Sequence, residues 1–177
     1  EGNRVYIGLH DTLMRLSPQV GHVLINANRN LAAYESFGVP VVVDSMPDFA
    51  GPLAGILAGL EQCQTPYLLT APCDSPFVPT DLAARLGAAL VEANARIAMP
   101  VTLEPDDAGQ LRRQVQPVFC LLDASLADDL TVYLQGGGRK IDAWTARHPM
   151  VEVLFDDAAA FANINTLAEL RQLAERR

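Results

Sequence analysis

The stretch PYLLTAPCDSPFVPTDLAARLGAALVEAN, residues 66–94, passes from an apolar run through a proline-rich loop into a helical pattern. PYLLT (66–70) predicts a buried strand, and TDLAARLGAALVEAN (80–94) predicts a helix capped by Thr80 or Asp81. A strand that leads through a loop into a helix is the unit from which α/β sheets are built.

The same alternation of β-branched runs and helical patterns continues through most of the chain. Further strands are predicted at 22–26, 39–44, 96–100, 116–122 and 151–155. Further helices are predicted at 8–16, 30–37, 52–63, 124–135, 139–148 and 166–177. The segment PVTLEPDDAGQLRRQVQP (100–117) breaks this rhythm and predicts a hairpin or a loop. We expect a single domain, residues 1–177, with a three-layer αβα, Rossmann-like fold around a mostly parallel sheet.

The composition narrows the class of protein. Of the 177 residues, 50% are hydrophobic and 19% are charged, which predicts a globular domain with a substantial core. No apolar run approaches the roughly 20 residues needed to cross a bilayer, and the first residues lack the pattern of a secretion signal. We therefore expect a cytoplasmic protein that does not act at a membrane. The net charge of −8 argues against tracking a nucleic-acid backbone, but a divalent cation could still bridge carboxylates to a nucleotide.

The cysteines and histidines give little support to covalent catalysis. The three cysteines are Cys63, Cys73 and Cys120. Their odd number, wide spacing and apolar neighbours predict reduced, buried thiols rather than disulfides or a zinc site. The three histidines lie apart from one another and from the cysteines. The remaining chemistry is positioning and electrostatics, which phosphoryl and nucleotidyl transfer require.

Three predicted strands end in a polar residue, namely Asn26, Asp44 and Asp74. In open α/β sheets, ligands bind at the carboxyl ends of the strands, although Asn and Asp are also ordinary turn and cap residues. Asp74 is bracketed by Pro72 and Pro76, which stiffen its loop. A carboxylate held in this way suits Mg²⁺, with phosphates completing the coordination shell. The alternative is that the carboxylate only caps a turn.

The stretch DFAGPLAGILAG (48–59) carries glycines at intervals of four. Gly55 and Gly59 share one helix face, where small residues permit close packing against a strand. Gly51 precedes the N-terminus of the helix, where free N–H groups and the helix dipole favour a phosphate or a ribose. We therefore count Gly51 among the candidate nucleotide-binding residues.

Two further stretches are candidates for ligand contacts. GGGRK (136–140) places two cations near a helix start, which fits either an anion partner or two solvated side chains. FANINT (161–166) puts Asn163 and Asn165 on one side of the chain if it is extended. Their amides could bind a phosphate or a pterin edge, or could satisfy the loop backbone.

Five stretches together resemble the molybdenum cofactor guanylyltransferases, in that family's order and spacing, over nearly the whole chain. They are INANRN (25–30), VVVDSMPDFAGPLAGILAGL (41–60), LLTAPCDSPFVPTDLAARL (68–86), GGGRKIDAW (136–144) and FANINTLAEL (161–170). The resemblance implies a nucleotidyltransferase that transfers GMP from Mg-GTP to molybdopterin, forming molybdopterin guanine dinucleotide and releasing pyrophosphate. It also implies cofactor-synthesis proteins and molybdoenzyme chaperones as protein partners.

The resemblance assigns roles residue by residue. Asn26 and Asp44 would contact the guanine nucleotide. Asp74 would be the catalytic residue that holds Mg²⁺ and the phosphates, while Asn163 and Asn165 would belong to the molybdopterin side.

The sequence departs from the family at its start. Family members begin with a strand that leads into an L-A-G-G loop, followed by an Arg and a Lys that grip the triphosphate, whereas this sequence begins just beyond that segment. Either the complete protein carries this segment as a mobile loop or the product is truncated and inactive, and we expect the first. The alternative functions are a CTP-dependent or sugar-phosphate nucleotidyltransferase and a non-catalytic pterin-binding module.

Overall fold

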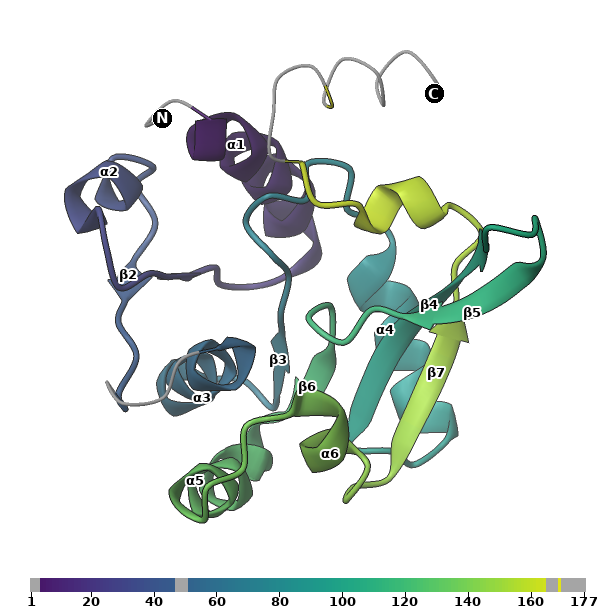
Figure 1. The fold of residues 1–177 in the computed structure, drawn as a ribbon. Helices are drawn as coiled ribbons and strands as arrows, with labels where there is room; N and C mark the ends of the chain where they lie inside the picture. Colours follow the sequence, from purple (N-terminus) through teal and green to yellow (C-terminus); the bar gives the residue numbers. More distant parts are fainter. Residues whose placement is uncertain (1–3, 47–50, 165–168, 170–177) are drawn as a thin grey trace.

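The computed structural model describes residues 4–46, 51–164 and 169, which form layers of helices on both faces of a sheet (Figure 1). The helices are α1 (Arg4–Leu16), α2 (Leu31–Glu35), α3 (Pro52–Gln62), α4 (Leu82–Glu92), α5 (Ala127–Gln135) and α6 (Ile141–Thr145). The strands are β1 (Ile25–Asn26), β2 (Val41–Val42), β3 (Tyr67–Leu69), β4 (Ile97–Pro105), β5 (Leu111–Val115), β6 (Leu121–Asp123) and β7 (Met150–Leu154). Short 3₁₀ helices occur at η1 (Ser17–Gln19), η2 (Ala124–Leu126) and η3 (Ala158–Phe161). The predicted α/β architecture is confirmed.

The described strands form two hydrogen-bonded sheets. β1 and β2 pair in parallel, and the larger sheet runs in the order β3, β6, β4, β5, with β7 paired to β4. β4 and β7 are parallel, whereas β6 is antiparallel to both β3 and β4, and β5 is antiparallel to β4. The expectation of a mostly parallel sheet is therefore not confirmed for these strands. The loop between β4 and β5 is shorter than the dozen or more residues that a parallel crossover needs, so β5 returns antiparallel to β4. β6 then continues along β4 in the same direction as β5.

The irregular segment 100–117 is a hairpin, because β4 and β5 pair from Val101 with Val115 to Pro105 with Leu111. At the tip, the Asp106 carboxylate accepts two backbone N–H groups of the turn, at 2.9 and 3.0 Å. The strand predicted at 116–122 is shorter than expected, because its first residues form a turn before β6 begins.

The core has two layers, one on each face of the larger sheet. Along β4, Ile97 and Met99 pack with residues of α3, α5 and α6, including the completely buried Trp144. The intervening Ala98 packs on the opposite face, with leucines of α4 and with Phe161. This alternation has the period of two that a strand covered on both faces requires. It places α4 behind the sheet and α3, α5 and α6 in front of it (Figure 1).

The ends of several elements differ from the prediction. α1 begins at Arg4, four residues earlier than the predicted helix, and β1 and β2 are each only two residues long. The helix predicted at 166–177 lies outside the described residues, except for position 169. Within the described part of the chain, no helix combines the length and the apolar character needed to span a bilayer.

The N-terminus of α4 is capped by a residue from another part of the chain. Asp81 occupies the N-cap position, but its side chain makes no capping hydrogen bond, so the predicted cap at Thr80 or Asp81 is wrong. Instead, Gln19 Oε1 accepts a hydrogen bond from the N–H of Ala83 at 2.9 Å. Gln19 Nε2 also donates to the carbonyl of Pro79 at 2.8 Å. Both groups of one amide therefore connect the end of η1 to the start of α4.

We predict that Gln19→Ala lowers the free energy of unfolding by about 1 to 2 kcal/mol, because it removes the cap and leaves backbone groups without partners. The matched control is Asp81→Ala, which removes only an exposed ion pair with Arg85 at 3.8 Å and should cost less than about 0.5 kcal/mol. Urea denaturation measures both. Equal losses in the two variants would contradict the assignment of the cap to Gln19.

Candidate functional site

Three polar side chains meet where β1 and β2 end. Asn26 Nδ2 donates to Asp44 Oδ1 at 2.8 Å, and Asn28 Nδ2 donates to Asp44 Oδ2 at 2.7 Å. The backbone N–H of Asp44 donates in turn to Asn28 Oδ1 at 2.9 Å. The structure thus brings Asn26 and Asp44 together, as expected for neighbouring strand ends. The carboxylate is held in one orientation and keeps lone pairs for N–H donors of a ligand.

Asn28 belongs to this group, although the sequence did not single it out. The available signal was its position two residues after Asn26, which places both side chains on the same side of an extended segment. We refer to Asn26, Asn28 and Asp44 as the strand-end amide cluster.

α3 approaches this cluster closely because it carries glycine where another side chain would collide. A Cβ atom added at Gly55 would lie 2.6 Å from Asn26 Oδ1, well inside van der Waals contact. A Cβ atom added at Gly59 would lie 3.0 Å from Leu68 Cδ2 on β3. The predicted packing role of both glycines is confirmed. α3 therefore contacts β1 and β3, which belong to separate sheets.

Gly51 lies at the N-terminus of α3, in a conformation that suits glycine. Its φ is +118°, a value that residues with a side chain rarely adopt. Gly51 is exposed, and Pro52 occupies the first position of the helix. The positive end of the α3 dipole therefore lies next to an exposed residue without a side chain, which suits an anion.

The loop 71–79 is anchored to the chain near residue 163. Ser75 is completely buried, and its hydroxyl donates to Asn163 Oδ1 at 3.1 Å. The N–H of Ile164 donates to the backbone carbonyl of Asp74 at 2.8 Å. The structure thus brings Asp74 and Asn163 to one place, whereas Asn165 lies outside the described residues. No hydrogen bond or ion pair among the described residues joins this place to the strand-end amide cluster.

The Asp74 carboxylate is half-buried, and no other residue in the described part of the chain donates a hydrogen bond to it. Desolvation raises its pKa, and a hydrogen bond from its own backbone N–H partly opposes that shift. Among the described residues, no group of three or more His, Cys, Asp and Glu side chains is arranged to hold a metal. Asp74 could therefore supply one protein oxygen to a cation whose other ligands came from phosphates or water.

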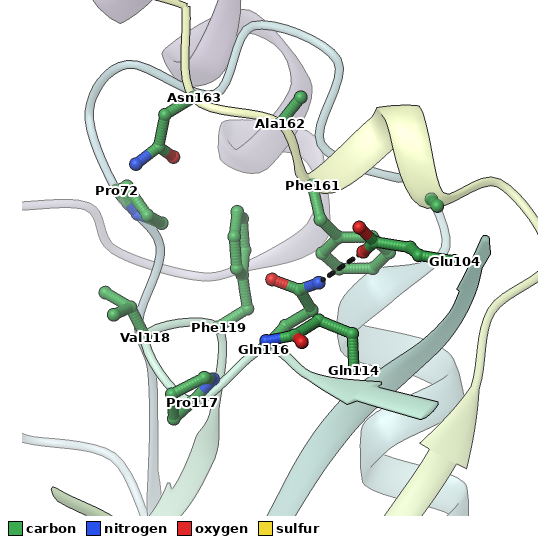
Figure 2. A pocket seen from close by; sticks show the side chains of 11 residues that line it. Pro72, Glu104, Gln114, Gln116, Pro117, Val118, Phe119, Phe161, Ala162 and Asn163 are labelled. Atoms are coloured by element: carbon green, nitrogen blue, oxygen red, sulfur yellow. Dashed lines mark hydrogen bonds between the residues drawn. The ribbon is translucent and has the colours of Figure 1, made fainter. Parts of the chain in front are cut away.

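A pocket of about 380 Å³ lies beside this loop (Figure 2). It is lined by Pro72, Glu104, Gln114, Gln116, Pro117, Val118, Phe119, Ala158, Phe161, Ala162 and Asn163. Apolar and polar side chains share its wall, and the polar ones come mainly from the β4–β5 hairpin. Its size is within the range of small-molecule sites. Asn163 belongs both to the pocket and to the anchor of the Asp74 loop.

The amino-acid sequence of this chain is similar to those of known proteins. The family model described as the MobA-like NTP transferase domain matches residues 9–153. A molybdenum cofactor guanylyltransferase from Ralstonia nicotianae is 90% identical over 165 residues, which are 93% of this chain and 81% of that protein. One from Cupriavidus taiwanensis is 69% identical over 160 residues, which are 90% of this chain and 78% of that protein. The chain belongs to this family.

Solved structures support the nucleotidyltransferase fold of this guanylyltransferase family member. Molybdopterin-guanine dinucleotide biosynthesis protein A from Archaeoglobus fulgidus has a TM-score of 0.69 at 22% identity, covering 96% of this chain and 84% of that one. The 2-C-methyl-D-erythritol 4-phosphate cytidylyltransferase from Thermus thermophilus has a TM-score of 0.70 at 17% identity, covering 99% and 94%. At these identities the likeness concerns the fold alone. The predicted family and fold are confirmed.

In this family member, the basic residue of GGGRK nearest the glycines has a structural role. Arg139 Nη1 donates to the carbonyls of Leu134 at 3.0 Å and of Gly138 at 2.6 Å, at the C-terminal end of α5. A cation is favourable there because the last carbonyls of a helix carry partial negative charge. The expectation that Arg139 is either a solvated side chain or a contact for an anion is therefore corrected. Lys140 remains exposed at the start of α6.

The cysteines differ in burial, and no disulfide joins them. Cys120 is completely buried, and burial raises its pKa to about 12. Cys63 is half-buried, and Cys73 is an exposed residue beside Asp74, so the prediction of a buried residue is wrong for Cys73. Desolvation and the Asp74 carboxylate nevertheless raise the pKa of the Cys73 thiol. The core thiol of Cys120 is therefore unsuited to nucleophilic chemistry, since the thiolate is the reactive form.

We predict different effects for alanine at the two α3 glycines. Gly55→Ala should displace the Asn26 side chain and break its bond to Asp44, because the new Cβ meets a polar atom held in place. Gly59→Ala should be tolerated or stabilising, because the Leu68 terminus can move and alanine favours a helix by about 1 kcal/mol. Thermal unfolding and the NMR signals of the Asn26 side-chain amide test this. A shift of the Asn26 side-chain amide signals in Gly59→Ala but not in Gly55→Ala would contradict this prediction.

Proposed function

We propose that this chain transfers GMP from Mg-GTP to molybdopterin, forming molybdopterin guanine dinucleotide and releasing pyrophosphate. The observation that carries the proposal is the half-buried Asp74 carboxylate, to which no other described residue donates a hydrogen bond, in a chain 90% identical to a molybdenum cofactor guanylyltransferase. A partly buried carboxylate without a partner is costly unless a cation is supplied from outside. Mg²⁺ bound to a nucleoside triphosphate is such a cation.

In the proposed reaction, a phosphate oxygen of molybdopterin attacks the α-phosphorus of GTP. The new phosphorus–oxygen bond forms as the bond from the α-phosphorus to the oxygen bridging to the β-phosphorus breaks, and the electron pair leaves with pyrophosphate. Mg²⁺ would neutralise charge that develops on the phosphate oxygens. The role of Asp74 is to hold that ion, and its anchored loop keeps the carboxylate in position before the substrates arrive.

The strand-end amide cluster is the proposed guanine side of the site. Asp44 is an acceptor held by two amides, and the edge of guanine that pairs with cytosine offers adjacent N–H donors to such an acceptor. Asn26 and Asn28 would complete the polar edge. The N-terminus of α3 behind Gly51 would lie toward the ribose or the phosphates.

The acceptor side of the proposed site lies at Asn163 and, outside the described residues, Asn165. Support comes from the position of Asn163, which lines the pocket and also accepts the hydrogen bond of Ser75 next to Asp74. We propose that residues 1–177 act as one nucleotide-binding domain in the cytoplasm, and the free cysteines are consistent with a reducing compartment.

We predict that Asp74→Asn abolishes GMP transfer without destabilising the protein. The folded-state pKa of Asp74 is raised, so the native state binds more protons than the unfolded state just above the ordinary Asp value. The ionised carboxylate therefore opposes folding at neutral pH, and this penalty disappears as the pH falls through the folded pKa. The melting temperature of the Mg²⁺-free variant should equal or exceed that of the native protein at pH 7, with the difference vanishing below about pH 4.

Transfer is measured with radiolabelled GTP and molybdopterin, and Asp107→Asn at the exposed hairpin tip is the control for a carboxylate lost elsewhere. Near-normal turnover by Asp74→Asn would remove Asp74 from the metal site. Pterin binding by the native protein without any transfer would instead favour the non-catalytic module.

We also predict that a melting-temperature titration with Mg²⁺ shows a larger shift for GTP than for CTP. Guanine offers two adjacent N–H donors to Asp44, whereas the corresponding edge of cytosine offers only its amino group. Asp44→Asn should reduce the GTP shift to the level of the CTP shift. Equal shifts for the two nucleotides in the native protein would contradict the guanine assignment and favour a CTP-dependent enzyme.

A further inference from the structure

The polar edge of the pocket is a small hydrogen-bond network on the β4–β5 hairpin. The hydroxyl of Thr102, which is completely buried, donates to Glu104 Oε1 at 2.9 Å. Gln116 Nε2 donates to Thr102 Oγ1 at 3.1 Å and to Glu104 Oε1 at 3.3 Å. Figure 2 shows the Gln116 amide directed at the Glu104 carboxylate beside Phe161. The network fixes the carboxylate at one side of the pocket.

Of the two Glu104 oxygens, only one accepts a hydrogen bond from a residue that the structure describes. Within the described residues, Oε1 accepts both hydrogen bonds and Oε2 accepts none. The cross-strand neighbour Arg112 does not neutralise it, because Arg112 Nε pairs with Asp106 Oδ2 at 2.8 Å. Glu104 is therefore a positioned carboxylate without a cationic partner in the described part of the chain, and it lines a pocket of small-molecule size.

The rest of the wall suits a flat ring. The rings of Phe119 and Phe161 meet edge to face, with centroids 5.0 Å apart and planes at 86°. Pro72 and Val118 add further apolar surface. An aromatic heterocycle that places its faces against apolar walls and one polar edge against a carboxylate fits this distribution.

We infer that Glu104 is a specificity-determining residue that binds the 2-amino-4-oxopyrimidine edge of a pterin in this pocket. The inference rests on the proposed function, because that function makes a pterin the acceptor. The 2-amino group and the adjacent ring N–H are parallel donors, and they bond to the two carboxylate oxygens of Glu104 as charge-assisted hydrogen bonds. Gln116 Nε2, whose bond to Oε1 is the longer of its two, turns toward the 4-oxo group. Thr102 is a positioning residue.

Guanine carries the same amino-oxo edge, so the position of the pocket has to separate the two ligands. The pocket includes Asn163, which accepts a hydrogen bond from Ser75 beside Asp74. The strand-end amide cluster lies instead at the ends of β1 and β2, which form the other sheet, and α3 packs against it there. The two polar edges would therefore bind at separate places, with the pterin in the pocket beside the Asp74 loop and the nucleotide on the strand-end amide cluster.

The test is a fluorescence titration of the purified protein with 6-hydroxymethylpterin and with 6-hydroxymethyllumazine, whose 2-oxo group replaces the 2-amino group. The native protein should bind the pterin at least about tenfold more tightly than the lumazine. Glu104→Gln should bind the pterin at least about tenfold more weakly and lose this preference, since the amide presents a donor where an acceptor is needed. Asp107→Asn, which removes the same charge at the hairpin tip, should behave like the native protein.

Mg-GTP thermal shifts in the same variants keep this inference separate from the proposed function, and they should be unchanged. Thr102→Val should weaken the preference for the pterin, and Thr102→Ser should restore it, which a purely structural role of Thr102 would not produce. Unchanged pterin affinity in Glu104→Gln, or displacement of the pterin by Mg-GTP in competition, would overturn the inference. Pterin binding that depends on Glu104 in a protein without GMP transfer would support it while contradicting the proposed transferase activity.

Discussion

The site depends on the buried contact between the loop that carries Asp74 and the segment at residues 163 and 164. The hydroxyl of Ser75 and the carbonyl of Asp74 both find partners there, across 88 residues of sequence in the case of Ser75 and Asn163. Losing the Asn163 partner would leave a completely buried hydroxyl unsatisfied, at a cost of about 1 to 3 kcal/mol. The same contact that stabilises the fold thus holds a half-buried carboxylate next to the pocket, where its desolvation would otherwise favour movement toward water.

A second constraint comes from α3, which packs against strands of both sheets. Glycine at positions 55 and 59 lets the helix axis approach Asn26 on one strand and Leu68 on another. The two contacts differ in kind, because one neighbour is a polar atom held by Asp44 and the other is the end of a flexible side chain. The close approach therefore positions the strand-end amide cluster as well as closing the core. At Gly55, the absence of a side chain therefore permits both the close packing of α3 and the observed position of Asn26 in the cluster.

Much of the fold could be predicted because its signals are local. Apolar runs located the centres of the strands, and spacing by four placed Gly55 and Gly59 on one face of α3. Two of the predictions that were wrong concern hydrogen-bond partners that residue type and spacing did not specify. Asp81 has the right residue type and position for a cap, but Gln19, far away in sequence, accepts the hydrogen bond of the Ala83 N–H in the first turn. Arg139 looked like an unused cation until its contact with the end of α5 was known. The relative direction of the strands was also not predicted, because it depends on the length of the connecting loops, which strand propensity does not specify.

By itself, the sequence determined the α/β class, the family, and the candidate residues Asn26, Asp44, Asp74 and Asn163, because ordered motifs and strand-end positions are properties of the linear chain. Only the tertiary structure decided which of these residues meet. It joined Asn28 to Asp44 and Asn163 to the Asp74 loop, and it converted an irregular segment into the hairpin on which buried Thr102 holds Glu104 at the wall of a pocket. Local patterns encode relations between residues two or four apart, whereas a pocket is formed by side chains that meet only when the core closes and excludes water.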